Sequence, residues 1–302
     1  MPSTLTRRAF ASSLFLGMAA TTFASPFKRS GGARFSLALA AYSFRDYFIH
    51  ASHPRDKKVA TEDRIDLLQF LDYCAEQGCE GAELTSYYFP SAPDSEFLLK
   101  LKRHAFLKHV ELSGTAVGNT FTHPSGADRD REVGLVKQWV DRAATLGIPH
   151  IRVFAGDRQR HDDATAQRHC IEALEECYAY AGEKGIMLGL ENHGGIVAHA
   201  SQLLAIVTAV QSPWLGINLD TGNFHTDDPY ADLEKCAPYA VNVQLKTEIQ
   251  KRGGSKEPAD LPRIMRILRS ATYQGYLVLE YEAAEDPYTA IPRILKDLRA
   301  LL

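Results

Sequence analysis

Four apolar segments in the second half of the chain each end in a side chain with an oxygen donor. In the stretches GLENHGG, NLDTGNFH, VNVQLKTE and LVLEYE these side chains are Glu191, Asp220, Gln244 and Glu280. Three carboxylates crowded at one place repel one another strongly unless a cation lies between them. Carboxylates together with a neutral oxygen donor suit a hard divalent cation. Taken singly, each residue is explained as a solvated group at a strand end, but in register the four predict a divalent metal site.

The elements that must bring these residues together are short strands that alternate with longer helices. Apolar runs of strand length recur after residue 35, and segments with the apolar spacing of a helix separate them. The expected strands cover residues 35–44, 78–86, 110–118, 150–156, 186–192, 215–220, 240–246 and 276–282. The expected helices cover residues 61–78, 94–109, 128–146, 163–185, 198–211, 229–237, 259–271 and 287–301. Thr61 is the expected N-cap of the first helix, and Gly78 its expected end.

This alternation predicts an α/β fold, a single (β/α)8 TIM barrel over residues 35–302. Strands joined through helices pair in parallel, and a count of eight favours a closed barrel over an open doubly wound sheet. No GxGxxG follows the first expected strand, which disfavours a dinucleotide-binding sheet. In a barrel the C-terminal strand ends meet at one mouth, where active sites lie. Because side chains alternate along a strand, Gln244 should point into the top of the barrel with Lys246 above it.

The same segments resemble those of the xylose isomerase-like barrel superfamily, the sugar phosphate isomerases and epimerases. The resemblance covers roughly residues 35–300 and rests on GLENHGG, NLDTGNFH, VQLKTE and LEYE, each at a strand end in the family's order. It implies that Glu191, Asp220, Gln244 and Glu280 are the metal ligands. Many epimerases carry histidine where this chain has Gln244, and hydroxypyruvate isomerase-like members carry glutamine there.

The chain departs from the family's epimerases after the aspartate of the sixth strand. Sugar epimerases often have a histidine three residues after that aspartate, whereas this chain has Asn223 there and His225 two residues further on. The departure concerns the substrate more than the metal.

The resemblance implies proton transfer next to a carbonyl group. One divalent ion, Mn²⁺ by preference and Mg²⁺, Co²⁺ or Zn²⁺ as alternatives, would act as a Lewis acid and stabilise the enediolate. Glu191 and Glu280 would exchange the proton, one as base and the other as acid. Glu282 lies on the same face as Glu280, and we prefer Glu280 because we expect Glu282 to lie already in the loop.

Five further residues are expected to contact the substrate, namely His193, Lys246, His225, Glu83 and Tyr42. His193 could bind a sugar oxygen or relay a proton, or it could be a loop histidine without such a role. Lys246 could neutralise enolate charge, or it could only pair with Glu248 or Glu280. The two readings of His225 are likewise both open.

Glu83 and Tyr42 end the second and first expected strands, so both are expected in the wall of the site. Glu83 could instead pair with Arg152 from the fourth strand. The Gly-rich segment 252–258 lacks the spacing of a phosphate-binding loop and is expected to form a mobile loop over the site.

The function that we expect is a divalent-metal-dependent isomerase or epimerase for a keto-sugar or a related hydroxy-ketone. One alternative is a lyase that uses the same metal and base to release the aglycone of a 3-keto-glycoside. Another alternative is a non-catalytic sugar-binding partner of an oxidoreductase. Endonuclease IV shares the superfamily, but its zinc site needs more histidines at strand ends than this chain has there.

Residues 1–34 have the composition of an export signal and a linker. Arg7 and Arg8 precede a short apolar run and a small-residue region near Ala24, as in a Tat-type secretory signal. The alternative is an N-terminal membrane anchor, for which the run is short. We therefore expect a periplasmic protein with a flexible linker after a cleaved signal. Five cysteines without a CxxC pair fit folding before export.

The overall composition limits the partners. The 302 residues are 45% hydrophobic and 24% charged, with a net charge of −3. This balance predicts neither a nucleic-acid partner nor binding to an anionic membrane after signal removal. The expected partner is a small-molecule carbohydrate. A homodimer would fit the family, although no segment identifies an interface.

Overall fold

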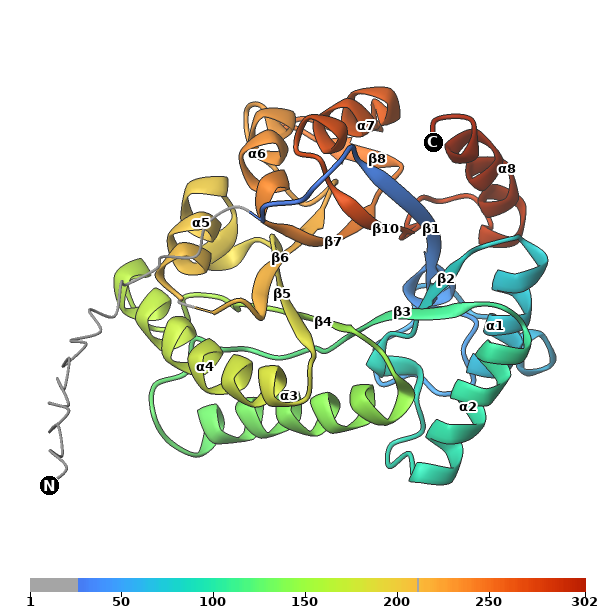
Figure 1. Ribbon diagram of the computed structural model, residues 1–302, viewed down its shortest axis with the longest axis horizontal. Helices are drawn as coiled ribbons and strands as arrows, with labels where there is room; N and C mark the ends of the chain where they lie inside the picture. The colour runs from blue at the N-terminus through green and yellow to red at the C-terminus, as the bar shows by residue number, and fades with distance from the viewer. Residues whose placement is uncertain (1–26, 211) are drawn as a thin grey trace, which may run out of the picture.

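Parallel strands close into a ring in the computed structural model, which describes residues 27–210 and 212–302 (Figure 1). The order around the ring is β1-β10-β7-β6-β5-β4-β3-β2. The strands are β1 Arg34–Ala40, β2 Gly81–Glu83, β3 Glu111–Ala116, β4 His150–Val153, β5 Met187–Glu191, β6 Leu215–Asp220, β7 Ala240–Leu245 and β10 Gln274–Leu279. The predicted single (β/α)8 barrel is confirmed.

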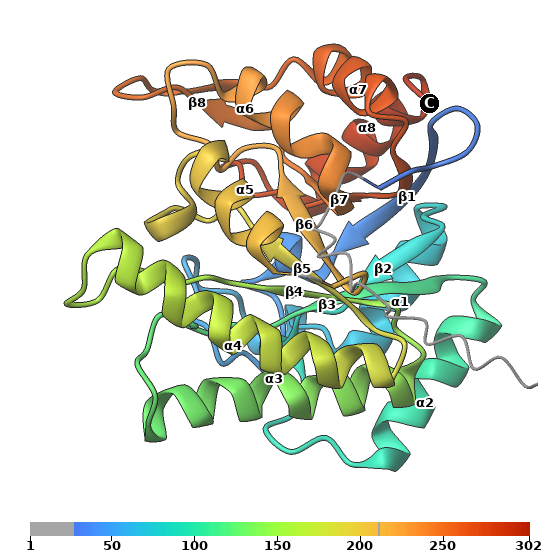
Figure 2. The same ribbon diagram turned by 60° about the vertical axis from the view of Figure 1, so that its left-hand side comes forward.

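Helices lie around the outside of the ring and connect its strands (Figures 1 and 2). They are α1 Leu67–Glu76, α2 Ser95–Leu107, α3 Ala127–Leu146, α4 Asp163–Glu183, α5 Ala200–Ala209, α6 Pro229–Cys236, α7 Leu261–Ser270 and α8 Pro287–Arg299. Asp66, and not Thr61, caps α1: its carboxylate accepts from Gln69 N while the Gln69 side chain accepts from Asp66 N. The expectation for Thr61 was wrong because that residue begins a separate 3-10 helix, Thr61–Asp63.

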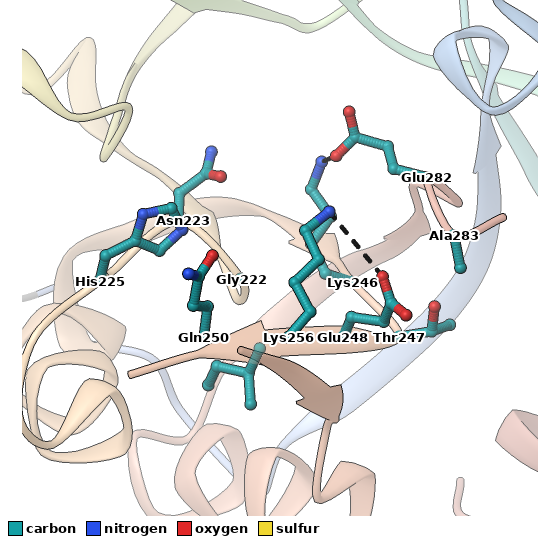
Figure 3. Close-up of a pocket in the computed structure, with 11 residues that line it drawn as sticks. Gly222, Asn223, His225, Lys246, Thr247, Glu248, Gln250, Lys256, Glu282 and Ala283 are labelled. Carbon is teal, nitrogen blue, oxygen red and sulfur yellow. Dashed lines mark hydrogen bonds and ion pairs between the residues drawn. The ribbon is translucent and has the colours of Figure 1, made fainter. Parts of the chain in front are cut away.

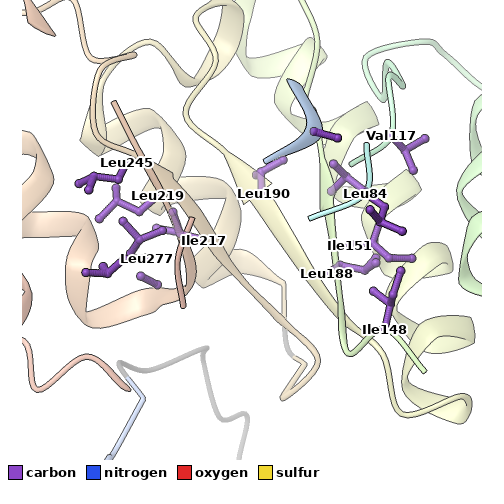
Figure 4. Packing of buried hydrophobic residues seen from close by; sticks show 14 of the residues in the cluster. Leu84, Val117, Ile148, Ile151, Leu188, Leu190, Ile217, Leu219, Leu245 and Leu277 are labelled. Atoms are coloured by element: carbon purple, nitrogen blue, oxygen red, sulfur yellow. The ribbon is translucent and has the colours of Figure 1, made fainter. Parts of the chain in front are cut away.

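The strands bury alternate side chains on opposite faces. Leu188 and Leu190 of β5, like Ile217 and Leu219 of β6, belong to the large hydrophobic core, part of which Figure 4 shows. The residues that alternate with them include Glu191 of β5 and Asn218 of β6, which are also buried. Polar side chains therefore lie inside the ring, and a packed apolar layer lies outside it.

An antiparallel hairpin follows β7 where the sequence predicted a mobile loop. It pairs β8, Glu248–Gln250, with β9, Lys256–Pro258. Gly253 lies in the connecting turn with φ of 69°, a conformation that glycine adopts readily. The hairpin gives the segment after β7 a defined shape beside the barrel mouth.

Residues 27–33, expected to belong to a flexible linker, contact the barrel. Phe27 N donates to Pro238 O at 3.1 Å, and Arg29 Nη2 donates to Ala240 O at 2.5 Å. The expected export signal in residues 1–26 lies outside the described residues. None of the described helices has the length and apolar character required to cross a membrane.

Candidate active site

Glu191 ends β5 and is held by four polar side chains. Arg152 Nε lies 3.0 Å from its Oε2, and both side chains are at most 5% exposed. Asn218 Nδ2 donates to the same oxygen at 3.3 Å. His193 Nδ1 lies 2.9 Å from Oε1, to which Asn223 Nδ2 donates at 3.1 Å. Burial raises the pKa of Glu191, but the charge of Arg152 and the hydrogen bond to His193 outweigh burial and hold the pKa below its ordinary value.

Gln244 connects three parts of the barrel interior. Its Nε2 donates to Glu280 Oε2 at 2.9 Å and to Glu83 Oε1 at 3.1 Å. Its Oε1 accepts from Asn218 Nδ2 at 2.7 Å, so Asn218 bridges Gln244 and Glu191. The register of β6 and β7 places Asp220 directly beside Gln244. Residues in or directly after five strands, β2, β5, β6, β7 and β10, thus form one connected group.

Lys246 follows β7 and carries its ammonium group into the carboxylates. Its Nζ forms ion pairs with Glu280 Oε1 and Glu282 Oε2 and lies 3.5 Å from Asp220 Oδ2. The Lys246 side chain is 8% exposed, and Asp220 is fully buried. The sequence offered Glu248 and Glu280 as ion-pair partners of Lys246. Lys246 pairs with Glu280, whereas Glu248 pairs with Lys256 at 3.8 Å.

Asp220 is the least satisfied acid of the group. Its Oδ1 accepts from Gly222 N at 2.8 Å, whereas its buried Oδ2 has no hydrogen-bond partner among the described residues. Burial, only partly countered by Lys246, raises the pKa of Asp220 to about 8. Burial also raises the pKa of Glu280 above its ordinary value. The site is therefore short of positive charge.

Glu83 and Tyr42, both expected in the wall of the substrate site, lie at different depths in the barrel. Glu83 is fully buried below the mouth, where Gln244 and Asn242 donate to it, and burial raises its pKa to about 8. Arg152 pairs with Glu191 and forms no ion pair with Glu83 within the described structure. Tyr42 lies in the 3-10 helix Ala41–Phe44 after β1. Burial, reinforced by the charges of Glu282 and Glu280, raises the pKa of Tyr42 to about 12.

A cavity lined largely by polar residues opens beside these side chains. Its volume is about 130 Å³, and its lining includes His225, Asn223, Lys246 and Glu282 together with Gln250 and Lys256 of the hairpin region. Figure 3 shows Asn223 and His225 on the opposite side of this cavity from Glu282. His193, with its side chain 56% exposed, lies outside this lining but has its Nδ1 3.2 Å from Nδ2 of Asn223. The cavity adjoins Lys246 and can receive a small polar ligand.

Sequence reasoning did not select two residues that organise the site. Asn218 precedes Asp220 by two positions, so alternation along β6 could have placed both inside the barrel. Arg152 was considered only as a partner of Glu83, because sequence alone does not give the distance across the barrel. Its actual partner is Glu191.

A divalent metal is held by acidic or neutral oxygen donors that converge on one point. As they stand, no three His, Cys, Asp or Glu side chains of residues 27–210 and 212–302 are arranged to hold a metal ion. The Lys246 ammonium lies among the acids that would be needed. The group nevertheless contains five buried or partly buried carboxyl groups against two permanent cations, namely Glu83, Glu191, Asp220, Glu280 and Glu282 against Arg152 and Lys246. This excess and the unpartnered Asp220 Oδ2 fit a hard divalent cation.

Comparison with protein families gives a match over most of the chain. A family model described as xylose isomerase-like TIM barrel matches residues 71–300. A curated relative, 3-oxo-isoapionate decarboxylase of Pectobacterium atrosepticum, is 27% identical over 187 residues. That match covers 60% of this chain and 61% of the decarboxylase, so it spans about three fifths of either protein.

Solved structures share the same architecture. The 3-keto-D-glucoside 4-epimerase of E. coli superposes with a TM-score of 0.64 at 16% identity, covering 89% of this chain and 99% of the epimerase. A probable 3-DHS dehydratase of Bacillus anthracis superposes with a TM-score of 0.62 at 15% identity, covering 87% of this chain and 98% of the dehydratase. At these identities the likeness shows the fold.

Proposed function

Because the chain belongs to the xylose isomerase-like TIM barrel family, we propose that it is a divalent-metal-dependent isomerase or epimerase acting on a keto-sugar or related hydroxy-ketone. The observation that carries this proposal is the connected group at the barrel mouth. Asn218 and Gln244 link Glu191 to Glu280, and Lys246 links Glu280 to Asp220. A solvated acid at an isolated strand end would not require such shared partners.

Four residues would hold the metal: Glu191, Asp220, Gln244 and Glu280. The Gln244 carbonyl oxygen accepts from Asn218, and a carbonyl has two lone pairs, so one remains for a cation. When bound, Mn²⁺, or Mg²⁺, Co²⁺ or Zn²⁺ in its place, would supply Lewis acidity for an enolate. The excess of carboxylates supports a cation of charge two.

Glu191 and Glu280 are the proposed proton-transfer pair. Arg152, His193, Asn218 and Asn223 hold Glu191 in one orientation, which suits a base that must meet a particular C–H bond. Glu280 instead accepts a hydrogen bond from Gln244 and forms an ion pair with Lys246. The two acids come from strands separated by β6 and β7, so a substrate between them has one on each side. Such a pair can remove a proton from one face and return one at the other face or at a neighbouring carbon.

Lys246, Tyr42, His193 and His225 are the proposed substrate contacts around this pair. The ammonium of Lys246 lies beside Glu280 and borders the cavity, where it can neutralise charge developing on a substrate oxygen. Glu83 is fully buried, so its proposed contribution is to hold the Gln244 amide and not to touch the substrate.

The second candidate is a lyase on 3-keto-glycosides. It needs the same base, which removes the proton at the carbon next to the ketone; the adjacent C–O bond then breaks and the aglycone leaves with a proton. The lining of the cavity extends from Lys246 to Gln250 and Lys256 of the hairpin region. This extent supports the proposal that a substituent beyond the keto group can be accommodated. A lyase reaction also agrees with the names of two similar proteins, a decarboxylase and a probable dehydratase.

We also propose that the protein is exported to the periplasm through its N-terminal segment. The twin arginines and the apolar run support a Tat-type signal. The five cysteines are free and buried, which supports folding in a reducing compartment before export.

Product analysis separates the candidates. The protein lacking residues 1–26 would be incubated with Mn²⁺ and, separately, ketohexoses, hydroxypyruvate and a 3-keto-glucoside; after metal removal, ¹³C NMR would identify the products. A rearranged or epimerised sugar with all substituents kept supports the isomerase. Aglycone release supports the lyase. No turnover of any compound, with Mn²⁺ demonstrably bound, would reject both the substrate class and the enzymatic proposal for it.

A further inference from the structure

The ammonium group of Lys246 lies where the carboxylates converge. It pairs with Glu280 and Glu282 and approaches Asp220 Oδ2 to 3.5 Å, and that oxygen has no hydrogen-bond partner among the described residues. One cationic side chain thus serves acids from the ends of β6 and β10. Its positive charge offsets part of the repulsion between these acids.

The stem of Lys246 is fixed while its tip has alternatives. Lys246 N donates to Thr221 Oγ1 at 2.8 Å. A Cβ on Gly222 would lie 2.8 Å from Lys246 Cγ, so the stem packs directly on this glycine. Beyond the stem, rotation of the last bonds of a lysine can move the ammonium between neighbouring acceptors.

Glu282 already pairs with the ammonium and would remain its partner if the ammonium moved away from Asp220 and Glu280. Its side chain is 33% exposed, whereas that of Glu280 is 9% exposed and that of Asp220 is fully buried. Glu282 lies toward the cavity and is not one of the four proposed metal ligands. Figure 3 shows Lys246 reaching toward it. An ammonium that leaves Asp220 and Glu280 therefore still has a carboxylate partner.

We propose that Lys246 is an internal counter-ion that competes with the divalent metal for Asp220 and Glu280 and withdraws to Glu282 when the metal binds. This inference rests on the metal dependence of the proposed function. Two cations cannot share the same oxygens without strong repulsion, so one must leave as the other enters. Lys246 then lowers metal affinity and stabilises the metal-free barrel.

Calorimetric titration with Mn²⁺ tests the competition directly. Lys246→Met removes the competing charge and keeps a stem of similar length. We expect it to bind Mn²⁺ at least tenfold more tightly than the wild type and to show a lower Tm without metal. An unchanged or weaker Mn²⁺ affinity in Lys246→Met would overturn the proposal.

A double-mutant cycle with Glu282→Gln separates withdrawal from simple loss of negative charge. In the wild-type background Glu282→Gln leaves the ammonium only Asp220 and Glu280, so we expect Mn²⁺ affinity to fall severalfold. In the Lys246→Met background there is no ammonium to accommodate, so the same substitution should have much less effect. An equal effect in both backgrounds would contradict the withdrawal. Glu282→Gln keeps the lysine and tests the idea even if Lys246→Met does not fold.

The outcomes also separate this inference from the proposed function. Mn²⁺ binding that is equal in the wild type and Lys246→Met rejects the counter-ion and leaves the metal enzyme standing. Binding only by Lys246→Met supports the counter-ion and rejects a metal-dependent wild type. Absence of binding by both proteins rejects both.

Discussion

Arg152 Nε lies 3.0 Å from Glu191 Oε2, and the two side chains are 5% and 4% exposed. Arg152 Nη1 also donates to Val117 O at 3.0 Å, and the guanidinium lies 3.8 Å from the ring centroid of Phe154. The proposed base is thus fixed by a buried cation that has its own supports. Removing that cation would leave a buried carboxylate without its strongest partner.

Arg152→Met should therefore destabilise the protein by about 3–5 kcal/mol, the usual result of breaking a buried pair from one side. The measurement is denaturant unfolding followed by circular dichroism. Arg131→Met is the matched control because its pair with Asp128 is exposed, with side chains 63% and 65% accessible. The control should unfold like the wild type. Equal stability of Arg152→Met and the wild type would show that the pair does not hold Glu191.

Acid sensitivity should arise partly from His150. This residue lies inside the barrel, and neither ring nitrogen has a hydrogen-bond partner within the described structure. Burial, with the charge of Arg152 adding to it, lowers its pKa from 6.5 to about 3. The unfolded chain takes up a proton below pH 6.5 while the folded protein does not, so stability falls as pH decreases from about 6.5 toward 3.

The slope attributable to one such group is about 1.4 kcal/mol per pH unit. Urea unfolding at pH 7.5, 6 and 5 would compare the wild type with His150→Asn, which cannot titrate in this range. The difference in stability between the two proteins should move in favour of the variant as pH falls. A constant difference across the three pH values would show that His150 is protonated in the folded state or does not contribute.

Gly189 should not tolerate a side chain. A Cβ at this position would lie 2.4 Å from His150 Nε2 and 3.1 Å from the backbone nitrogen of Asn218. Gly189→Ala should therefore cost about 1–3 kcal/mol through overpacking. Gly134 in α3 is the control, since a Cβ there meets no atom within 4 Å. Gly134→Ala should gain about 0.5–1 kcal/mol from helix propensity. Thermal unfolding of both variants measures the contrast, and a neutral Gly189→Ala would contradict the packing described.

Much of the fold follows from local patterns, and the departures have local causes. The strand predicted over residues 215–220 coincides with β6, because Leu215, Ile217 and Leu219 recur at every second position up to Asp220. The first helix begins later than expected because Asp66 and Gln69 form a capping box that outcompetes Thr61. The hairpin of β8 and β9 was missed because its strands have three residues each and lack an alternating apolar pattern.

The site was harder to predict because its contacts cross the barrel. Period-two alternation suffices to turn Gln244 and Lys246 toward the interior. It does not reveal that Asn218 bridges Gln244 and Glu191, or that Lys246 reaches the acids that were assigned to a metal. These relationships depend on the register between strands, including the shift between Ile217 and Asn218 against β7. The metal and the substrate contacts remain proposals.

Glu280 and Glu282 offer a matched pair for the catalytic assignment. Both contact Lys246, and they lie two residues apart. At saturating Mn²⁺, Glu280→Gln should lower kcat by about 10²–10⁴-fold, as expected for loss of a general acid or base. Glu282→Gln should lower kcat less than tenfold, because Glu282 only receives the ammonium of Lys246. A larger loss in Glu282→Gln than in Glu280→Gln would reverse the assignment.

The most direct test of proton transfer at this site is deuterium exchange into a keto-sugar in D₂O. The protein lacking residues 1–26 would be loaded with Mn²⁺, incubated with the substrate found by product analysis, and freed of metal before NMR. The account predicts deuterium at the carbon next to the carbonyl with the wild type and at least a hundredfold slower exchange with Glu191→Gln. Undiminished exchange in Glu191→Gln, with Mn²⁺ still bound, would contradict the assignment of Glu191 as the base.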